Sequence, residues 1–77
     1  MSKILFFAHL RDVVGQDSVE IDVSGKTVAE LKQYVAETYS LQKLDSVMVA
    51  INEEFASDDE VVKEGDTVAF IPPVSGG

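Results

Sequence analysis

Three stretches of the chain are apolar at almost every position, which is typical of strands that lie inside a sheet. They are residues 4–8, 47–51 and 67–71. A run without alternation indicates a strand that is covered on both faces, because each face then has to be apolar. We expect three strands here, with the first and the last as neighbours at the centre of the sheet. Proline ends the last run at Pro72 and Pro73, since it has no amide donor and a fixed φ.

Two further segments are periodic. Residues 19–23 alternate between apolar and polar side chains, which predicts a half-buried strand whose acidic residues face water. Thr27 and Glu30 have the spacing of a capping box, in which the hydroxyl and the carboxylate bond free amides at a helix start. This box predicts an amphipathic helix over residues 28–38. Its apolar stripe needs a sheet to lie on and consists of Val28, Leu31 and Val35.

Short connecting segments separate these elements. Residues 11–16 indicate a loop with room for a short helical turn that ends at Gly15, and residues 52–54 indicate a turn before a brief return strand. Residues 61–66 are a short apolar segment followed by a turn that contains a glycine. The order strand, strand, helix, strand, short elements, strand predicts an α+β fold of two layers. The pattern is typical of a β-grasp roll, in which one main helix packs across a mixed sheet.

The composition restricts the class of protein. The chain has 77 residues, six lysines and arginines, 14 aspartates and glutamates, and no cysteine, so its net charge is −8. This size fits one small domain without disulfides. The acidic surface argues against nucleic acid and anionic membranes as partners. No apolar run reaches the roughly 18 residues of a membrane span, and the N-terminus is too short for a signal peptide, so we expect a cytoplasmic protein.

Most of the negative charge lies in residues 47–77, where one lysine stands against seven acidic residues, a net charge of −6. Two interpretations stay open for this segment. It is either a solvated hairpin rim or a surface that attracts a basic partner. A calcium site is disfavoured, because residues 57–60 lack the alternating spacing and the glycine of an EF-hand loop.

Side-chain catalysis is poorly supported. The chain has no thiol nucleophile, His9 is its only histidine, and it has neither a serine elbow nor a phosphate-binding glycine loop. What remains is the main chain at Gly76 and Gly77, which follow the prolines. These glycines are either a frayed end or a reactive carboxylate on a thin arm that fits a narrow tunnel in another protein. We expect residues 1–71 to form the domain and residues 72–77 to form a flexible tail with a reach of about 19 Å.

Several motifs occur together in one order. Residues 5–8 are followed by Arg11, a helix start at Thr27 comes next, and residues 49–52 read Val-Ala-Ile-Asn. The most specific part is residues 64–77, where Gly-Asp, an apolar strand, Pro-Pro-Val and Ser-Gly-Gly follow each other. With these motifs almost the whole chain resembles the small subunits of molybdopterin synthase, the sulfur carriers of molybdenum cofactor biosynthesis in the ubiquitin-like β-grasp superfamily.

The resemblance implies a reaction at Gly77, with Gly76 beside it. An E1-like adenylating enzyme would activate the Gly77 carboxylate with ATP, and a sulfur donor would convert it to a thiocarboxylate. The tail would enter the large subunit of the synthase, and its sulfur would attack cyclic pyranopterin monophosphate to form the dithiolene. The resemblance implies no metal and no permanently bound cofactor in this chain, which would be the subunit of a sulfurtransferase that lacks the substrate pocket. The implied assembly is a heterotetramer of two small and two large subunits.

The resemblance also implies an apolar contact with the large subunit near the tail. Phe7, Phe55 and Ile71 match its positions, although an aromatic residue is common where Ile71 stands. Core packing is the alternative for Phe7. A surface salt bridge is the alternative to a partner contact for Arg11. The tail residues that would also touch the partner are Pro72, Pro73, Val74 and Ser75.

Three other functions fit parts of the same pattern. The sulfur carrier of thiamine thiazole synthesis shares the fold and the diglycine, but it tends to lack the Pro-Pro-Val-Ser segment and the Phe-Phe-Ala start. A ubiquitin-like modifier would be conjugated to lysines instead of donating sulfur. A β-grasp binding module would carry an inert tail.

Overall fold

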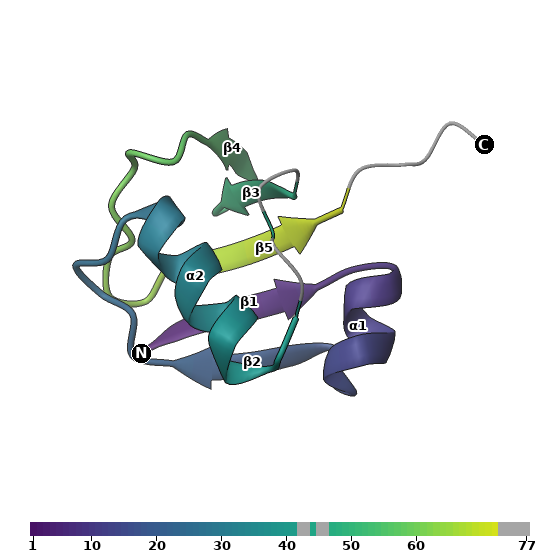
Figure 1. Cartoon of the computed structure of the whole chain (residues 1–77). Coiled ribbons are helices and arrows are strands. Elements are labelled where there is room, and N and C mark those ends of the chain that lie inside the picture. Colours follow the sequence, from purple (N-terminus) through teal and green to yellow (C-terminus); the bar gives the residue numbers. More distant parts are fainter. Residues whose placement is uncertain (42–43, 45–46, 73–77) are drawn as a thin grey trace.

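The structure is a computed structural model, and it describes residues 1–41, 44 and 47–72. Its elements are β1 (Ser2–Phe6), α1 (His9–Val14), β2 (Ser18–Ile21), α2 (Val28–Thr38), β3 (Met48–Ile51), β4 (Glu54–Ala56) and β5 (Thr67–Ile71). The five strands form one sheet in the order β2-β1-β5-β3-β4, with α2 across it (Figure 1). β1 and β5 are parallel and the other pairs are antiparallel. This confirms the predicted mixed sheet, its single main helix, and the pairing of the first strand with the last.

Helix α2 begins and ends where its sequence pattern predicts. The Thr27 hydroxyl accepts from the Glu30 amide at 3.2 Å, and the Glu30 carboxylate accepts from the Thr27 amide at 2.9 Å. Both bonds of the capping box are therefore present. The predicted stripe of three apolar residues is completely buried. It forms one core with the strand residues that face it, among them Ile4, Phe6, Val49, Val68 and Phe70.

In the part of the chain that the structure describes, a helix covers only one face of the sheet, which corrects the expectation that the apolar runs are buried on both faces. In β1, Ser2, Ile4 and Phe6 are buried, whereas Lys3 is exposed and Leu5 is half-buried. β5 alternates in the same way. Within the described residues, α2 lies on one face and α1 lies at the end of the sheet (Figure 1). The apolar runs therefore supply a core on one side and a more exposed surface on the other.

The segment between β1 and β2 is more regular than expected. Helix α1 has six residues, where the sequence indicates a loop with room for a short turn. It ends at Gly15, as predicted, because a φ of 84° favours glycine there. Leu10 is buried in the core and attaches the helix to the sheet. His9 lies exposed at the start of the helix.

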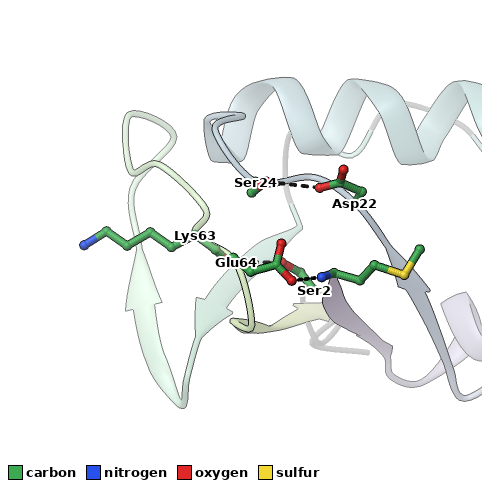
Figure 2. Close-up of polar contacts among 6 residues, drawn as sticks. Ser2, Asp22, Ser24, Lys63 and Glu64 are labelled. Carbon is green, nitrogen blue, oxygen red and sulfur yellow. Dashed lines mark hydrogen bonds and ion pairs between the residues drawn. The ribbon is translucent and has the colours of Figure 1, made fainter.

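Polar contacts fix the start of β1 to the turn that precedes β5 (Figure 2). The buried Ser2 hydroxyl donates to the Lys63 carbonyl at 3.1 Å, and the Met1 ammonium pairs with the Glu64 carboxylate. Because β1 and β5 are parallel, their carboxyl ends lie side by side at the other end of the strands. At that end the chain continues from β5 toward the predicted tail.

Candidate partner-binding surface

The face of the sheet opposite α2 carries apolar residues that strand register brings together. Leu5 lies opposite Ala69 in the β1–β5 pair, Ala69 lies opposite Ala50 in the β5–β3 pair, and Ala50 lies opposite Phe55 in the β3–β4 pair. Paired residues point to the same face of a sheet. These four residues therefore form one continuous apolar row across four strands.

A second apolar row lies beside the first, toward the carboxyl end of β5. Ile71 is paired with Met48. Phe7 follows β1 directly and continues the alternation that puts Leu5 on this face. We call the two rows together the apolar patch, which consists of Leu5, Phe7, Met48, Ala50, Phe55, Ala69 and Ile71. The other end of the same face is polar, since it carries Lys3, Glu20 and Thr67.

The largest side chains of the apolar patch are open to solvent. Phe55 is 68% exposed, Met48 47% and Phe7 45%. Single exposed apolar residues are common, but a contiguous group on one face marks an interaction surface. Phenylalanine and methionine are also among the residue types that are enriched at the centres of protein interfaces. The arrangement therefore fits a protein partner.

The three apolar contacts predicted from the sequence lie together on this face. Phe7 is too exposed for the core packing that was its alternative, Phe55 is mostly exposed, and Ile71 is half-buried. Their contact with a partner stays a prediction. The sequence does not single out the other members of the apolar patch, because alternate residues look alike in an unbroken apolar run. The strand register separates them, and it reveals Leu5, Met48, Ala50 and Ala69.

Arg11, the predicted polar contact, lies exposed on α1. Its Nε atom is 3.6 Å from Asp17 Oδ1, and both side chains are mostly exposed. The surface salt bridge that was its alternative is thus present in the free chain. Exposed ion pairs of this kind contribute little stability, and the contact of Arg11 with a partner stays a prediction.

The tail begins at the edge of the apolar patch, because Ile71 is the last residue of β5. Pro72 is buried, so it packs with the body of the free chain, although we predicted it as a partner contact. The remaining predicted tail residues lie outside the described part of the chain. They are Pro73, Val74, Ser75, Gly76 and Gly77.

The described residues offer little side-chain chemistry of their own. They include no group of three or more histidine, cysteine, aspartate or glutamate residues that could hold a metal ion. The backbone amide and the hydroxyl of Thr27 lower the pKa of the Glu30 carboxyl, which is a helix cap and not an acid–base site. An open groove of about 620 Å³ lies along α2, and its Lys32 pairs with Asp58 at 3.2 Å.

Neither α1 nor α2 is both long and apolar enough to cross a membrane.

Comparison with known proteins identifies the family. A family model described as the ThiS family matches residues 4–77. The chain belongs to the ThiS family. It is 40% identical over 81 residues to the molybdopterin synthase sulfur carrier subunit of Escherichia coli, and the match covers 100% of both chains. It is 33% identical over 82 residues to the protein of the same name from Haemophilus influenzae, again with 100% of both chains covered.

Solved structures show the same architecture. The small archaeal modifier protein 1 of Haloferax volcanii is 27% identical, with a TM-score of 0.78 and coverage of 95% of this chain and 97% of the other. A Pyrococcus furiosus protein described as molybdopterin converting factor subunit 1 is 31% identical, with a TM-score of 0.77 and coverage of 95% and 97%. A chain in the complex of subunits 1 and 2 of the Helicobacter pylori molybdopterin-converting factor is 21% identical, with a TM-score of 0.62 and coverage of 99% and 97%, and shares the fold. These neighbours of the ThiS family chain confirm its ubiquitin-like β-grasp fold.

Proposed function

We propose that this chain is the sulfur carrier subunit of a molybdopterin synthase. The observation that carries the proposal is the apolar patch, which lies at the edge of the sheet where the tail begins. A carrier that presents its terminus to another protein needs a docking surface at that place. The curated relatives that bear this subunit name, at 33–40% identity over the full chain, support the same function.

In the proposed reaction the chain supplies its terminal carboxylate as the reacting group. An oxygen of the Gly77 carboxylate attacks the α-phosphorus of ATP in an activating enzyme, and pyrophosphate leaves. A sulfur donor then displaces AMP and leaves a thiocarboxylate, which is an ionised and soft nucleophile. Gly76 has no side chain, so the terminus fits a narrow channel. The sulfur attacks cyclic pyranopterin monophosphate and forms a thioester, and water then cleaves its acyl C–S bond, which leaves the sulfur on the pterin and restores the Gly77 carboxylate. Two such transfers supply the dithiolene; ATP and the sulfur donor are used in trans.

The proposed partner of the apolar patch is the large subunit of the synthase, in an assembly of two small and two large subunits. The Helicobacter pylori complex of subunits 1 and 2 contains a chain of this fold, which supports such a pairing. The substrate is an anionic phosphate, so the pocket of the large subunit is expected to be basic. A carrier with a net charge of −8 complements it. The second partner is an E1-like adenylating enzyme, and the proposed compartment is the cytoplasm.

A ubiquitin-like modifier is the second candidate function. The likeness to the small archaeal modifier protein 1 favours it. A modifier would join its terminal carboxyl to a lysine amine of another protein, and the products would be isopeptide adducts of higher mass. The sulfur carrier of thiamine thiazole synthesis has less support, because the curated relatives named above are synthase subunits.

The test of the proposed function compares the full chain with a variant that lacks Gly77. Each is incubated with the activating enzyme, ATP, a sulfur donor, the large subunit and cyclic pyranopterin monophosphate, and the sulfurated pterin is quantified. We expect product from the full chain and none from the truncated chain, with equal melting temperatures for both. Sulfurated pterin from the truncated chain would contradict the proposal. Lysine adducts without pterin product would favour the modifier.

A further inference from the structure

The turn between β3 and β4 has a demanding backbone conformation. Asn52 and Glu53 are its two central residues, and both have a positive φ, 52° and 72°. Two such residues in a two-residue hairpin loop define a type I′ turn, in which glycine is usual at the second position. Asparagine tolerates this conformation, but glutamate is strained in it. Other contacts therefore have to hold the turn.

Three hydrogen bonds hold this turn against the start of β5, and a fourth fixes the Asp66 side chain that takes part in one of them. The Asn52 amide donates to the Thr67 carbonyl at 2.8 Å, and the Asn52 side-chain oxygen accepts from the Thr67 amide at 3.0 Å. The Asn52 side-chain nitrogen donates to Asp66 Oδ1 at 3.0 Å, and Asp66 Oδ2 accepts from the Lys63 amide at 2.9 Å. We call this set the turn clamp; it consists of the Asn52 and Asp66 side chains and the backbone of Asn52, Lys63 and Thr67. Both polar atoms of the side-chain amide and both carboxylate oxygens are used.

The turn clamp continues the β3–β5 ladder beyond its last pair, which is Ile51 with Val68. β4 leaves the turn as an edge strand of three residues, and β3 is its only partner among the described strands. Phe55 is the middle residue of β4 and lies opposite Ala50. So short an edge strand has few bonds of its own. The angle at which β4 continues the sheet therefore depends on the turn clamp, and the position of Phe55 depends on that angle.

We propose that Asn52 and Asp66 are positioning residues for partner binding, which hold the β3–β4 hairpin so that Phe55 lies in line with the rest of the apolar patch. Neither residue belongs to the patch. Both residues lie beside Thr67, the first residue of β5. Ile71, which belongs to the patch, is at the other end of that strand, where the tail begins. A patch that is formed before binding loses less conformational freedom on binding. The inference rests on the proposed function, because it takes the large subunit of the synthase as the partner of the apolar patch.

An exchange of the two side chains tests the proposal. N52D puts a carboxylate oxygen in the place of the nitrogen that now donates to Asp66, so two carboxylates repel each other. N52D/D66N keeps the net charge of the wild type and restores all four bonds, with the donor at position 66 instead of position 52. We expect N52D to weaken binding of the large subunit by at least about tenfold. The double variant should bind within about threefold of the wild type.

Two further measurements distinguish positioning from a general loss of stability. Hydrogen exchange well below the melting temperature should show faster exchange of the β4 amides and of the Thr67 amide in N52D, and unchanged exchange in β1 and in the rest of β5. In an F55A background, N52D should weaken binding much less than it does in the wild type, because the clamp acts through the Phe55 side chain. S24A is the matched control, since it removes another exposed hydrogen bond at a turn, from the Ser24 hydroxyl to the Asp22 carboxylate at 3.0 Å (Figure 2). It should leave binding unchanged.

Three results would overturn the inference while the proposed function stands. They are equal binding by N52D and the wild type, no recovery in N52D/D66N, and an equal loss from N52D with and without the Phe55 ring. A wild-type chain that does not bind the large subunit at all is a failure of the proposed function. It is seen before any variant is compared, and it overturns this inference as well.

Discussion

The substitution Phe55→Ala tests whether the apolar patch binds a partner. Phe55 is 68% exposed in the free chain. A phenylalanine presents about 200 Å² in total, so about 135 Å² is available for a partner to cover, and about 100 Å² of this is lost on truncation to alanine. At about 25 cal/mol per Å², this loss corresponds to about 2.5 kcal/mol, or a Kd that rises about 70-fold. The same side chain has little burial to lose in the free chain, so the free energy of unfolding should change by less than about 0.5 kcal/mol.

Isothermal titration calorimetry of each variant with the large synthase subunit measures this effect. Tyr34→Ala is the matched control, because it also removes an exposed aromatic ring, but from α2 in the opposite layer. We expect its Kd to stay within about threefold of the wild type. A folded F55A variant that binds as tightly as the wild type would refute the reasoning. An equal loss of affinity in both variants would refute the location of the binding surface.

Three further predictions concern the apolar patch and the cap of α2. Met48→Lys should weaken binding of the large subunit at least about tenfold, because the partner would bury an unpaired charge. If calorimetry shows unchanged affinity, Met48 does not lie in the interface. Thr27→Ala should lower the melting temperature by about 4–8 °C, the equivalent of about 1 kcal/mol for a lost N-cap; an unchanged thermal melt would contradict the role of the cap. Hydrogen bonds from Thr27 lower the pKa of the Glu30 carboxyl below its usual value of 4.5, so the ionised group stabilises the fold above that pH and stops doing so as the pH falls through the lowered value. The wild type should therefore melt at a higher temperature than E30Q above pH 4.5, and this difference should shrink as the pH falls below 4.5; a difference that is constant with pH would contradict this.

Local signals made α2 and β5 predictable from the sequence. The bounds of α2 follow from the capping box at Thr27 and Glu30 and from a stripe with helical spacing, and both signals lie within a few residues. β5 is a short apolar run between a glycine turn and Pro72, so its bounds are also marked locally. The pairing of β1 with β5 could also be predicted, because both strands are apolar at almost every position. Such strands lie toward the centre of a sheet.

Features that depend on distant contacts could not be predicted. Leu5 and Met48 look like core residues in the sequence, and only the register shows that they lie on the face opposite α2. An apolar residue that packs in the core and an apolar residue that binds a partner look the same in the sequence. The composition of a strand therefore does not show which of its residues are exposed. Helix α1 is short for an isolated helix, and burial of Leu10 supports it from outside the segment. The turn clamp joins Asn52 to a side chain 14 residues away, which no local pattern marks.

The central claim is that Gly77 carries sulfur, and the intact mass of the chain tests it most directly. The purified chain is incubated with the activating enzyme, ATP and a sulfur donor, and its mass is compared with that of a variant that lacks Gly77. Oxidation of Met1 or Met48 adds nearly the same mass as an exchange of oxygen for sulfur, so fragmentation has to locate the change. The account predicts one oxygen exchanged for sulfur in the C-terminal peptide of the full chain and no exchange in the truncated chain. A full chain that gains no sulfur at Gly77, or a truncated chain that gains as much, would contradict it.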